Sequence, residues 1–228
     1  MIPRVVLVTD PRYDLEHTTR IVRWAGDALG PGGLLVQLRD KAASEADLLV
    51  GARSLRDVTR EVRAVFVVNG SVSIAHATGA DGVHLPSSEG SVSSRVTAAR
   101  ALLGAQAFVT AAAHDDAQLE AASLAGATAA LVSPIFATPG KGPARGVTAI
   151  ASARSIVDAA RRAPALLVYA LGGVTPENAE SCGLAGANGV AVIRALYDAT
   201  GEDGVRRAAL ALGRAATSTA VAGRRGEC

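Results

Sequence analysis

Eight short apolar runs alternate along the chain with longer segments of helical period. The runs are almost continuously apolar, as expected of strands that are covered on both faces. They lie at Val5–Thr9, Leu34–Leu38, Val65–Val68, Gly82–Leu85, Ala107–Thr110, Ala129–Val132, Leu166–Ala170 and Gly189–Val192. The intervening helical segments are predicted at Leu15–Leu29, Ser44–Val62, Val72–Ala77, Val92–Leu103, Ala117–Leu124, Thr148–Arg161, Pro176–Leu184 and after Gly201. This alternation is typical of repeated βα units.

Eight such units in 228 residues favour one α/β domain, a closed (β/α)8 or TIM barrel. An open doubly wound sheet usually has fewer strands. The first run also passes directly into Thr9-Asp10-Pro11, without the glycine-rich turn of a dinucleotide-binding sheet. We expect the barrel over residues 1–217 and a flexible tail over residues 218–228.

Composition narrows the possible partners. A net charge of +2 and an aromatic fraction of 3% provide no basic or stacking surface for nucleic acid. The apolar run at the N-terminus is too short for a signal peptide or a membrane span. The two cysteines, Cys182 and Cys228, fit neither a disulfide framework nor a metal-binding spacing. We therefore expect a cytoplasmic protein that binds neither nucleic acid nor membrane. The oligomeric state stays open, and a homodimer is one option.

Candidate chemistry lies where the strands end, because TIM barrels build their sites at the carboxyl ends of their strands. Gln37, Arg39 and Lys41 alternate onto one face after the second strand, where an amide and two cations could hold an anion. A salt-bridged rim is the alternative. Asn69 ends the third strand and could also be a turn former. His84, in the fourth strand, could be a packed histidine rather than a functional one.

The loop after the sixth strand, residues 133–146, contains three glycines and two cations, Lys141 and Arg145. Such a loop is typical of a mobile lid that closes over a phosphorylated ligand, although an ordinary surface loop is the alternative. Glu89, after the fourth strand, is a candidate metal ligand or only a charge in the first turn of a helix. His114 follows the fifth strand and is similarly ambiguous.

Two turns at the end of the barrel predict a phosphate site. Gly172 and Gly173 follow the seventh strand, and Ile193 and Arg194 follow the eighth. Backbone N–H groups at these positions form the usual phosphate cradle of the fold. A tight turn without a ligand is the alternative for the two glycines.

These motifs together resemble the strand-end motifs of thiamine phosphate synthase and of its relative, thiazole tautomerase. The resemblance runs in order from Val5 to Tyr197. It rests on Gln37-Leu38-Arg39-Asp40-Lys41, Asn69, Gly82-Val83-His84-Leu85, Pro134-Ile135-Phe136-Ala137-Thr138 with Lys141, Leu171-Gly172-Gly173-Val174, and Gly189-Val190-Ala191-Val192-Ile193.

The resemblance implies a transferase of thiamine biosynthesis that acts on small phosphorylated substrates. In this reaction hydroxymethylpyrimidine diphosphate loses diphosphate, and the nitrogen of a thiazole phosphate captures the pyrimidine carbocation. The resemblance implies that Gln37, Arg39, Lys41, Asn69 and Lys141 hold the pyrimidine diphosphate, with Arg39, Lys41 and Lys141 as catalytic residues. It also implies that the thiazole phosphate is held by Thr138, Gly172 and Ile193. His84, Gly173 and Arg194 complete the expected substrate-binding set.

The sequence also departs from the synthase pattern, which places a magnesium-binding Asp directly after Asn69. Gly70 stands there, so Glu89 is the remaining expected ligand and Mg²⁺ should bind weakly or not at all if Gly70 is decisive. Other departures are Ser87, Ala112, Gly140 and Arg194.

Gly70 and Pro86 instead resemble the tautomerase, an isomerase of the thiazole carboxylate phosphate. Its proton-transferring His is Pro134 in this chain, so His84 or His114 would have to move the proton. Three hypotheses therefore stay open: a synthase, a tautomerase, and a non-catalytic thiazole-phosphate binding protein.

Overall fold

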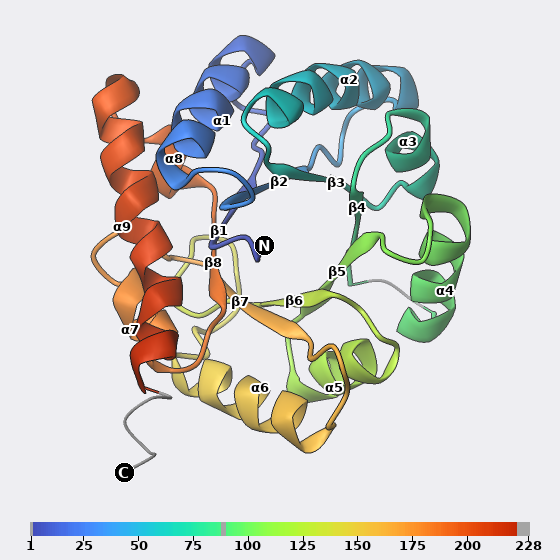
Figure 1. The fold of residues 1–228 in the computed structure, drawn as a ribbon, viewed down its shortest axis with the longest axis vertical. Helices are drawn as coiled ribbons and strands as arrows, with labels where there is room; N and C mark the ends of the chain where they lie inside the picture. Colours follow the sequence, from blue (N-terminus) through green and yellow to red (C-terminus); the bar gives the residue numbers. More distant parts are fainter. Residues whose placement is uncertain (1, 88–89, 223–228) are drawn as a thin grey trace.

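Eight parallel strands close into a barrel in the computed structural model, which describes residues 2–87 and 90–222, with side chains up to Arg214 (Figure 1). Each strand pairs with the next along the chain, and the last pairs with the first. The strands are β1 (Val5–Val8), β2 (Leu34–Leu38), β3 (Val65–Asn69), β4 (Gly82–Leu85), β5 (Phe108–Ala113), β6 (Ala129–Val132), β7 (Leu167–Leu171) and β8 (Gly189–Val192). The predicted TIM barrel is confirmed.

Helices surround the barrel as an outer layer (Figure 1). They are α1 (Leu15–Leu29), α2 (Glu45–Glu61), α3 (Val72–Ala77), α4 (Val92–Leu103), α5 (Asp116–Leu124), α6 (Thr148–Ala159), α7 (Ala179–Leu184), α8 (Arg194–Tyr197) and α9 (Gly201–Ala222). In the described part of the chain, no helix has the length and apolar character that crossing a membrane requires. Because α9 continues to Ala222, it passes the expected end of the barrel at residue 217, and the flexible tail stays a prediction.

Three elements differ from the sequence-based expectation by three residues or more. β5 extends to Ala113 rather than ending at Thr110, because Ala113 pairs with Val132 of β6. α7 begins at Ala179 rather than at Pro176. The side chain of Asn178 accepts a hydrogen bond from the Thr175 amide at 2.8 Å, which holds the preceding residues in a turn. α8 was not expected, since four residues carry no periodic signal.

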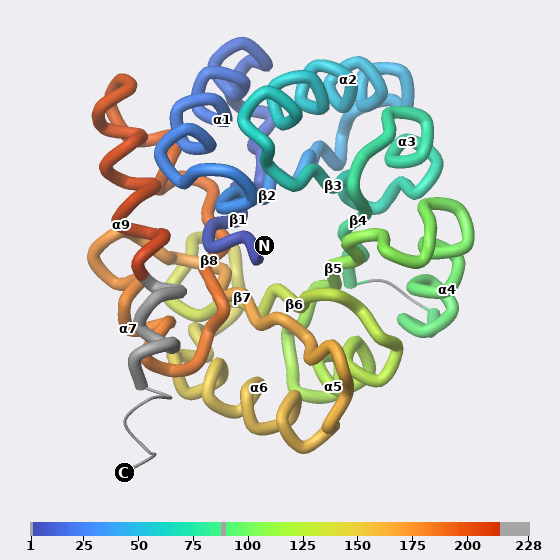
Figure 2. Tube along the Cα trace, viewed as in Figure 1, coloured from blue at the N-terminus to red at the C-terminus, as the bar shows by residue number. Residues whose placement is uncertain are grey.

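The hydrophobic core has two parts, one inside the barrel and one between the strands and the helices. Side chains that alternate inward fill the interior: Val6, Val8, Leu35, Val67, Ala129, Leu131, Tyr169 and Ala191. Tyr169 closes the N-terminal end, where its hydroxyl donates to the Pro3 carbonyl at 2.7 Å. Figure 2 shows the first residues of the chain near the barrel axis. The interior is therefore filled with side chains and offers no channel.

A repeated hydrogen-bond bracket fixes the N-terminal ends of β4, β6 and β8. The residue before each of these strands, Asp81, Thr128 or Asn188, bonds one residue of the preceding strand twice. Its N–H donates to that residue's carbonyl, and its side-chain oxygen accepts that residue's N–H. The partners are Phe66 of β3, Val109 of β5 and Val168 of β7. The bracket sets the register between neighbouring strands.

Candidate active site

Two amide side chains lie at the mouth formed by the carboxyl ends of the strands. Gln37 and Asn69 continue the inward rows that begin with Leu35 and Val67, because strand side chains alternate. Gln37 Nε2 donates to Asn69 Oδ1 at 3.3 Å. Gln37 is buried, and no group in the described residues donates to its Oε1. A buried acceptor without a partner is costly, so Gln37 Oε1 is suited to a ligand N–H.

His84 lies beside these amides and is buried. Its Nδ1 is 2.8 Å from the Thr110 hydroxyl. Burial, and then the positive charges of Arg39 and Arg95 and the nearby His114, lowers the pKa of His84 to about 3. The imidazole is therefore neutral at physiological pH. It can hydrogen-bond a ligand but makes a poor proton acceptor near pH 7.

Three cations converge at the mouth from two different loops. The sequence has 21 arginines but only two lysines, Lys41 after β2 and Lys141 after β6. Lys141 is at the surface, yet the pKa of its ammonium is lowered, first by desolvation and then by the charges of Arg39 and Lys41. We call Arg39, Lys41 and Lys141 the cation cluster. Cations crowded in this way are stabilised when an anion binds among them.

Arg39 is held in place through its backbone. The Arg39 N–H donates to Thr9 Oγ1 at 2.8 Å, and Thr9 Oγ1 donates to the Arg39 carbonyl at 3.4 Å. Thr9 is 6% exposed, so these bonds lie largely out of water. They tie the end of β2 to the end of β1.

The long loop after β6 is fixed at its base and projects at its tip. Ile135 and Phe136 donate their N–H groups to Leu171 and Gly172, both at 2.9 Å. On the returning side, Arg145 and Gly146 donate to carbonyls of the same base, also at 2.9 Å. Only residues 137–144, which we call the lid segment, extend beyond this paired base. Lys141 is carried on this segment.

Arg145 does not join the cation cluster, although its place in the loop predicted a role beside a phosphorylated ligand. Its Nη2 donates to Asp116 Oδ1 at 2.7 Å, and Ser152 Oγ donates to the other carboxylate oxygen at 2.8 Å. This ion pair joins the base of the loop to α5 and α6. The two cations of the loop therefore differ, because Arg145 pairs with Asp116 whereas Lys141 belongs to the cation cluster.

The turn after β7 packs directly against the base of this loop. Gly172 and Gly173 have φ values of 99° and 64°, which favour glycine. A Cβ on Gly172 would lie 3.0 Å from Pro134 Cα and 3.3 Å from Thr138 Oγ1, and one on Gly173 would lie 2.7 Å from Phe136 Cβ. The structure thus brings Thr138 close to Gly172, and the phosphate cradle stays a prediction.

Ile193 and Arg194 follow on the neighbouring strand. Ile193 immediately precedes α8, and Arg194 is the first residue of that helix. The Arg194 side chain is exposed and has no ion-pair or hydrogen-bond partner among the described residues. It is free to bind an anion from solvent.

Two surface cavities lie among the outer helices, and only one of them is away from the cation cluster. One, of about 490 Å³, is lined by Leu85, Pro86, Arg95 and Gln118, among others, between α4 and α5. The other, of about 240 Å³, lies between α1 and α2 and includes Arg39 of the cation cluster in its lining. The first has a mainly apolar wall and lacks Arg39, Lys41 and Lys141, so the chemistry is assigned to the mouth and not to this cavity.

The whole barrel matches a known family. Residues 5–196 match the family model described as thiamine monophosphate synthase. The chain belongs to this family. Thiamine-phosphate synthase of Methanoculleus marisnigri is 37% identical over 190 residues, which cover 81% of this chain and 82% of that protein. Thiamine-phosphate synthase of Gloeobacter violaceus is 36% identical over 196 residues, 86% of this chain but only 53% of that protein.

A solved structure supports the fold of this synthase family. Thiamine phosphate pyrophosphorylase from Pyrococcus furiosus matches with a TM-score of 0.73 and 24% sequence identity. The match covers 95% of this chain and 96% of that one. At this identity, the likeness shows the fold alone.

The described residues do not by themselves form a magnesium site in this member of the synthase family. No group of three His, Cys, Asp or Glu side chains that could hold a metal occurs among them. Gly70 offers only backbone, and its N–H already donates to the His84 carbonyl at 2.9 Å. Glu89, the expected metal ligand, lies outside the described residues. Mg²⁺ therefore stays a prediction.

Sequence reasoning missed three polar residues of the synthase mouth. Thr110 bonds His84, Thr9 bonds Arg39, and Ser133 Oγ lies 3.1 Å from His114 Nδ1. Each ends an apolar run or directly follows one. Alternation in β5 and β6 could have placed Thr110 and Ser133 on the inward face, as it did Gln37 and Asn69.

Proposed function

We propose that the chain catalyses the thiamine phosphate synthase reaction. The bond between the pyrimidine methylene carbon and the diphosphate oxygen breaks, and its electron pair leaves with the diphosphate. The lone pair of the thiazole nitrogen then forms a new C–N bond to the pyrimidine carbocation. The products are thiamine phosphate and diphosphate. The observation that carries this proposal is the cation cluster, which contains both lysines of the chain.

The cation cluster supplies what a dissociative step needs. Negative charge builds up on the diphosphate as its bond to carbon breaks, so fixed cations stabilise the transition state more than the substrate. Arg39 can bind phosphate oxygens in a bidentate manner, whereas the lysines act as compact point charges. Because Lys141 is carried on the lid segment, we infer that diphosphate binding draws this segment toward β2.

The amide pair is suited to the pyrimidine. Gln37 Oε1, buried without a donor, can accept from an amino group on the ring, and Asn69 lies 3.3 Å from Gln37 Nε2. Neutral His84 at the same level of the barrel adds no positive charge next to the carbocation. We therefore assign the pyrimidine to the β2–β4 side of the mouth.

The thiazole phosphate is assigned to the other side. Gly172, Gly173 and Thr138 lie together at the end of β7, and Ile193 and Arg194 follow β8. Binding both substrates at one mouth places the thiazole nitrogen beside the carbocation, and this positioning accounts for much of the catalysis of such a reaction.

The tautomerase hypothesis has less support. It needs a group that accepts and returns a proton near neutral pH, and the low pKa of His84 is poorly matched to that task. His114 remains, with its Nδ1 at 3.2 Å from the Ser133 carbonyl. No observation in the structure favours isomerase or pure binding chemistry over transfer.

A coupled assay with hydroxymethylpyrimidine diphosphate and thiazole phosphate, with and without Mg²⁺, tests the proposal. Lys41→Ala and Lys141→Ala should each lower kcat/KM by about 100-fold or more, as removal of a charge-stabilising group does elsewhere. Arg53→Ala, which removes an exposed cation from α2, is the matched control and should retain wild-type turnover. Wild-type rates in both lysine variants would overturn the proposal.

The remaining expectations concern partners, location and assembly. We propose small phosphorylated substrates as the partners and the cytoplasm as the location, which suits the buried free thiol of Cys182. A homodimer stays an option that sedimentation of the purified protein would decide.

A further inference from the structure

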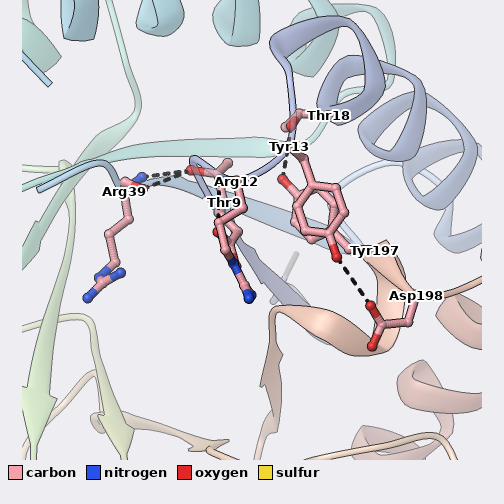
Figure 3. A network of polar contacts seen from close by, with 8 residues as sticks. Thr9, Arg12, Tyr13, Thr18, Arg39, Tyr197 and Asp198 are labelled. Carbon is pink, nitrogen blue, oxygen red and sulfur yellow. Dashed lines mark hydrogen bonds and ion pairs between the residues drawn. The ribbon is translucent and has the colours of Figure 1, made fainter. Parts of the chain in front are cut away.

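The loop between β1 and α1, residues 9–14, lies between the two halves of the proposed site. On one side, Thr9 bonds the backbone of Arg39. On the other side, Tyr13 reaches the short helix α8, whose first residue is Arg194 (Figure 3). One loop thus contacts both the segment that carries a cation of the diphosphate site and the helix that begins at the phosphate site.

Tyr13 contacts α8 in two ways. Its ring stacks on the ring of Tyr197, with centroids 4.3 Å apart and an interplanar angle of 13°. Its hydroxyl donates to Asp198 Oδ1 at 3.2 Å. Tyr197 and Asp198 are the last residue of α8 and the residue that ends it. The chain has only three tyrosines, and two of them meet here.

Tyr197 is anchored in turn to α1. Its hydroxyl is 3.0 Å from Thr18 Oγ1, and both residues are buried. Because Thr18 Oγ1 donates its own proton to the Asp14 carbonyl at 3.0 Å, the Tyr197 hydroxyl is the donor between them. Tyr197 therefore joins α8 to the start of α1, beneath the Tyr13 ring.

The loop itself is internally braced. The Asp10 carboxylate accepts the Arg12 N–H at 3.0 Å and the Arg12 guanidinium at 2.5–3.0 Å. The pKa of Asp10 is lowered, chiefly by this hydrogen bonding to Arg12. The Tyr13 N–H donates to the Asp10 carbonyl at 3.1 Å. A loop braced in this way keeps a fixed shape between Thr9 and Tyr13.

We propose that the β1–α1 loop is a strut that positions both phosphate-bearing substrates. Through Tyr13 it holds α8, and with it Ile193 and Arg194, at the thiazole-phosphate side. Through Thr9 it holds Arg39 at the diphosphate side. Tyr13 and Thr9 are positioning residues that act through their partners. The inference rests on the proposed function, because that function assigns the two sides.

Removing each end of the strut should affect a different substrate. Tyr13→Ala should raise the KM and the directly titrated Kd for thiazole phosphate about tenfold, since it removes both the stack and the hydrogen bond. The KM for the pyrimidine diphosphate and kcat at saturation should stay within about twofold. Tyr13→Phe keeps the stack and should recover most of the loss.

Thr9→Val should affect the other substrate, the pyrimidine diphosphate. It keeps the shape of the side chain but removes the acceptor of the Arg39 N–H, so the KM for the pyrimidine diphosphate should rise about fivefold. The Kd for thiazole phosphate should remain at the wild-type value.

Tyr169→Phe is the matched control. It removes a buried tyrosine hydroxyl that donates to Pro3 at the opposite end of the barrel. It should lower the melting temperature without shifting either KM. Asp198→Ala should behave like Tyr13→Phe, and the double variant should be no worse than either single one, because both remove the same bond.

The outcomes separate the two proposals. Suppose that the wild-type protein turns over both substrates, but that Tyr13→Ala and Thr9→Val each raise both KM values alike or raise neither. This result would overturn the strut, and the proposed function would stand. Wild-type protein that neither binds thiazole phosphate nor forms product would overturn the proposed function, and the strut with it. Both proposals are supported if Tyr13→Ala raises only the KM for thiazole phosphate and Thr9→Val raises only the KM for the pyrimidine diphosphate.

Discussion

Two basic side chains at the mouth have lowered pKa values for the same reasons but with different consequences. His84 is buried among Thr110 and the barrel strands, so burial keeps it neutral. Lys141 stands on a projecting loop, where an arriving anion can reverse the effect of desolvation and of Arg39 and Lys41. Depth in the barrel thus separates a neutral hydrogen-bonding group from a charged one.

The burial of His84 should make the protein sensitive to acid. Its pKa is about 3 in the folded protein and about 6.5 in the unfolded chain, so between these pH values the unfolded chain binds a proton that the folded chain does not. Stability should therefore fall as pH drops below about 6.5, by about 2–3 kcal/mol from this group at pH 4.5. Urea unfolding of wild type and of His84→Asn, at pH 7.5 and pH 4.5, measures the difference. Equal acid sensitivity in both proteins would contradict this reading of His84.

At the residue scale, alternation along the strands was enough to predict where a side chain lies but not which side chain it contacts. Gln37 and Asn69 were expected at the mouth from their places after apolar runs, and the structure puts them in contact. The partner of Arg145 was not predictable, because Asp116 lies 29 positions away and meets it only when α5 and the β6 loop pack together. Local patterns describe which face a side chain occupies, whereas pairing depends on the assembled barrel.

At the element scale, the bracket before each even-numbered strand from β4 onward joins neighbouring units of the barrel. Asp81, Thr128 and Asn188 differ in charge and size but accept from a backbone N–H in the same way. The three copies share a side-chain oxygen that accepts the backbone N–H of a residue in the preceding strand. Among the three copies an ion pair occurs in the first only, where Arg56 pairs with Asp81 at 2.9 Å, whereas in the third copy Arg154 donates to the uncharged Asn188 Oδ1 at 3.3 Å.

The comparison of the three brackets predicts that Asp81 stabilises the fold through its acceptor oxygen and not through its charge. Asp81→Asn should be tolerated better than Asp81→Ala, because an amide oxygen can still accept from the Phe66 N–H, as Asn188 does for Val168. The alanine variant leaves that strand N–H unpaired and should lose about 1–3 kcal/mol of unfolding free energy. Urea midpoints of the two variants check this. If both lose equally, the ion pair with Arg56 and not the bracket is the stabilising contact.

Element boundaries were predictable where the local signal was strong. α1 runs from Leu15 to Leu29 as expected, since an apolar stripe and an Asp14 cap define it. α8 was missed because its four residues are held by tertiary contacts of Tyr197 and not by propensity. The same helix carries Arg194, so part of the proposed site depended on an element that no local pattern indicates.

At the scale of the whole molecule, counting βα units was enough to predict closure, because eight units close into a barrel without a free sheet edge. α9 then packs against α7, α1 and β8, on the side where the last strand meets the first (Figure 2). The last helix therefore covers the closing seam of the barrel.

The end of the folded unit can be tested through α9. Its described buried residues are Val205, Ala209, Leu212 and Gly213, and a Cβ on Gly213 would lie 2.8 Å from Leu29 Cδ2 of α1. Leu212→Ala should therefore cost about 2–5 kcal/mol of unfolding free energy, as loss of a buried leucine side chain does. A chain that ends at Thr217 keeps all of these residues and should match the wild-type urea midpoint and turnover. If this shortened chain is destabilised as much as Leu212→Ala, residues after 217 pack on the barrel and belong to the domain.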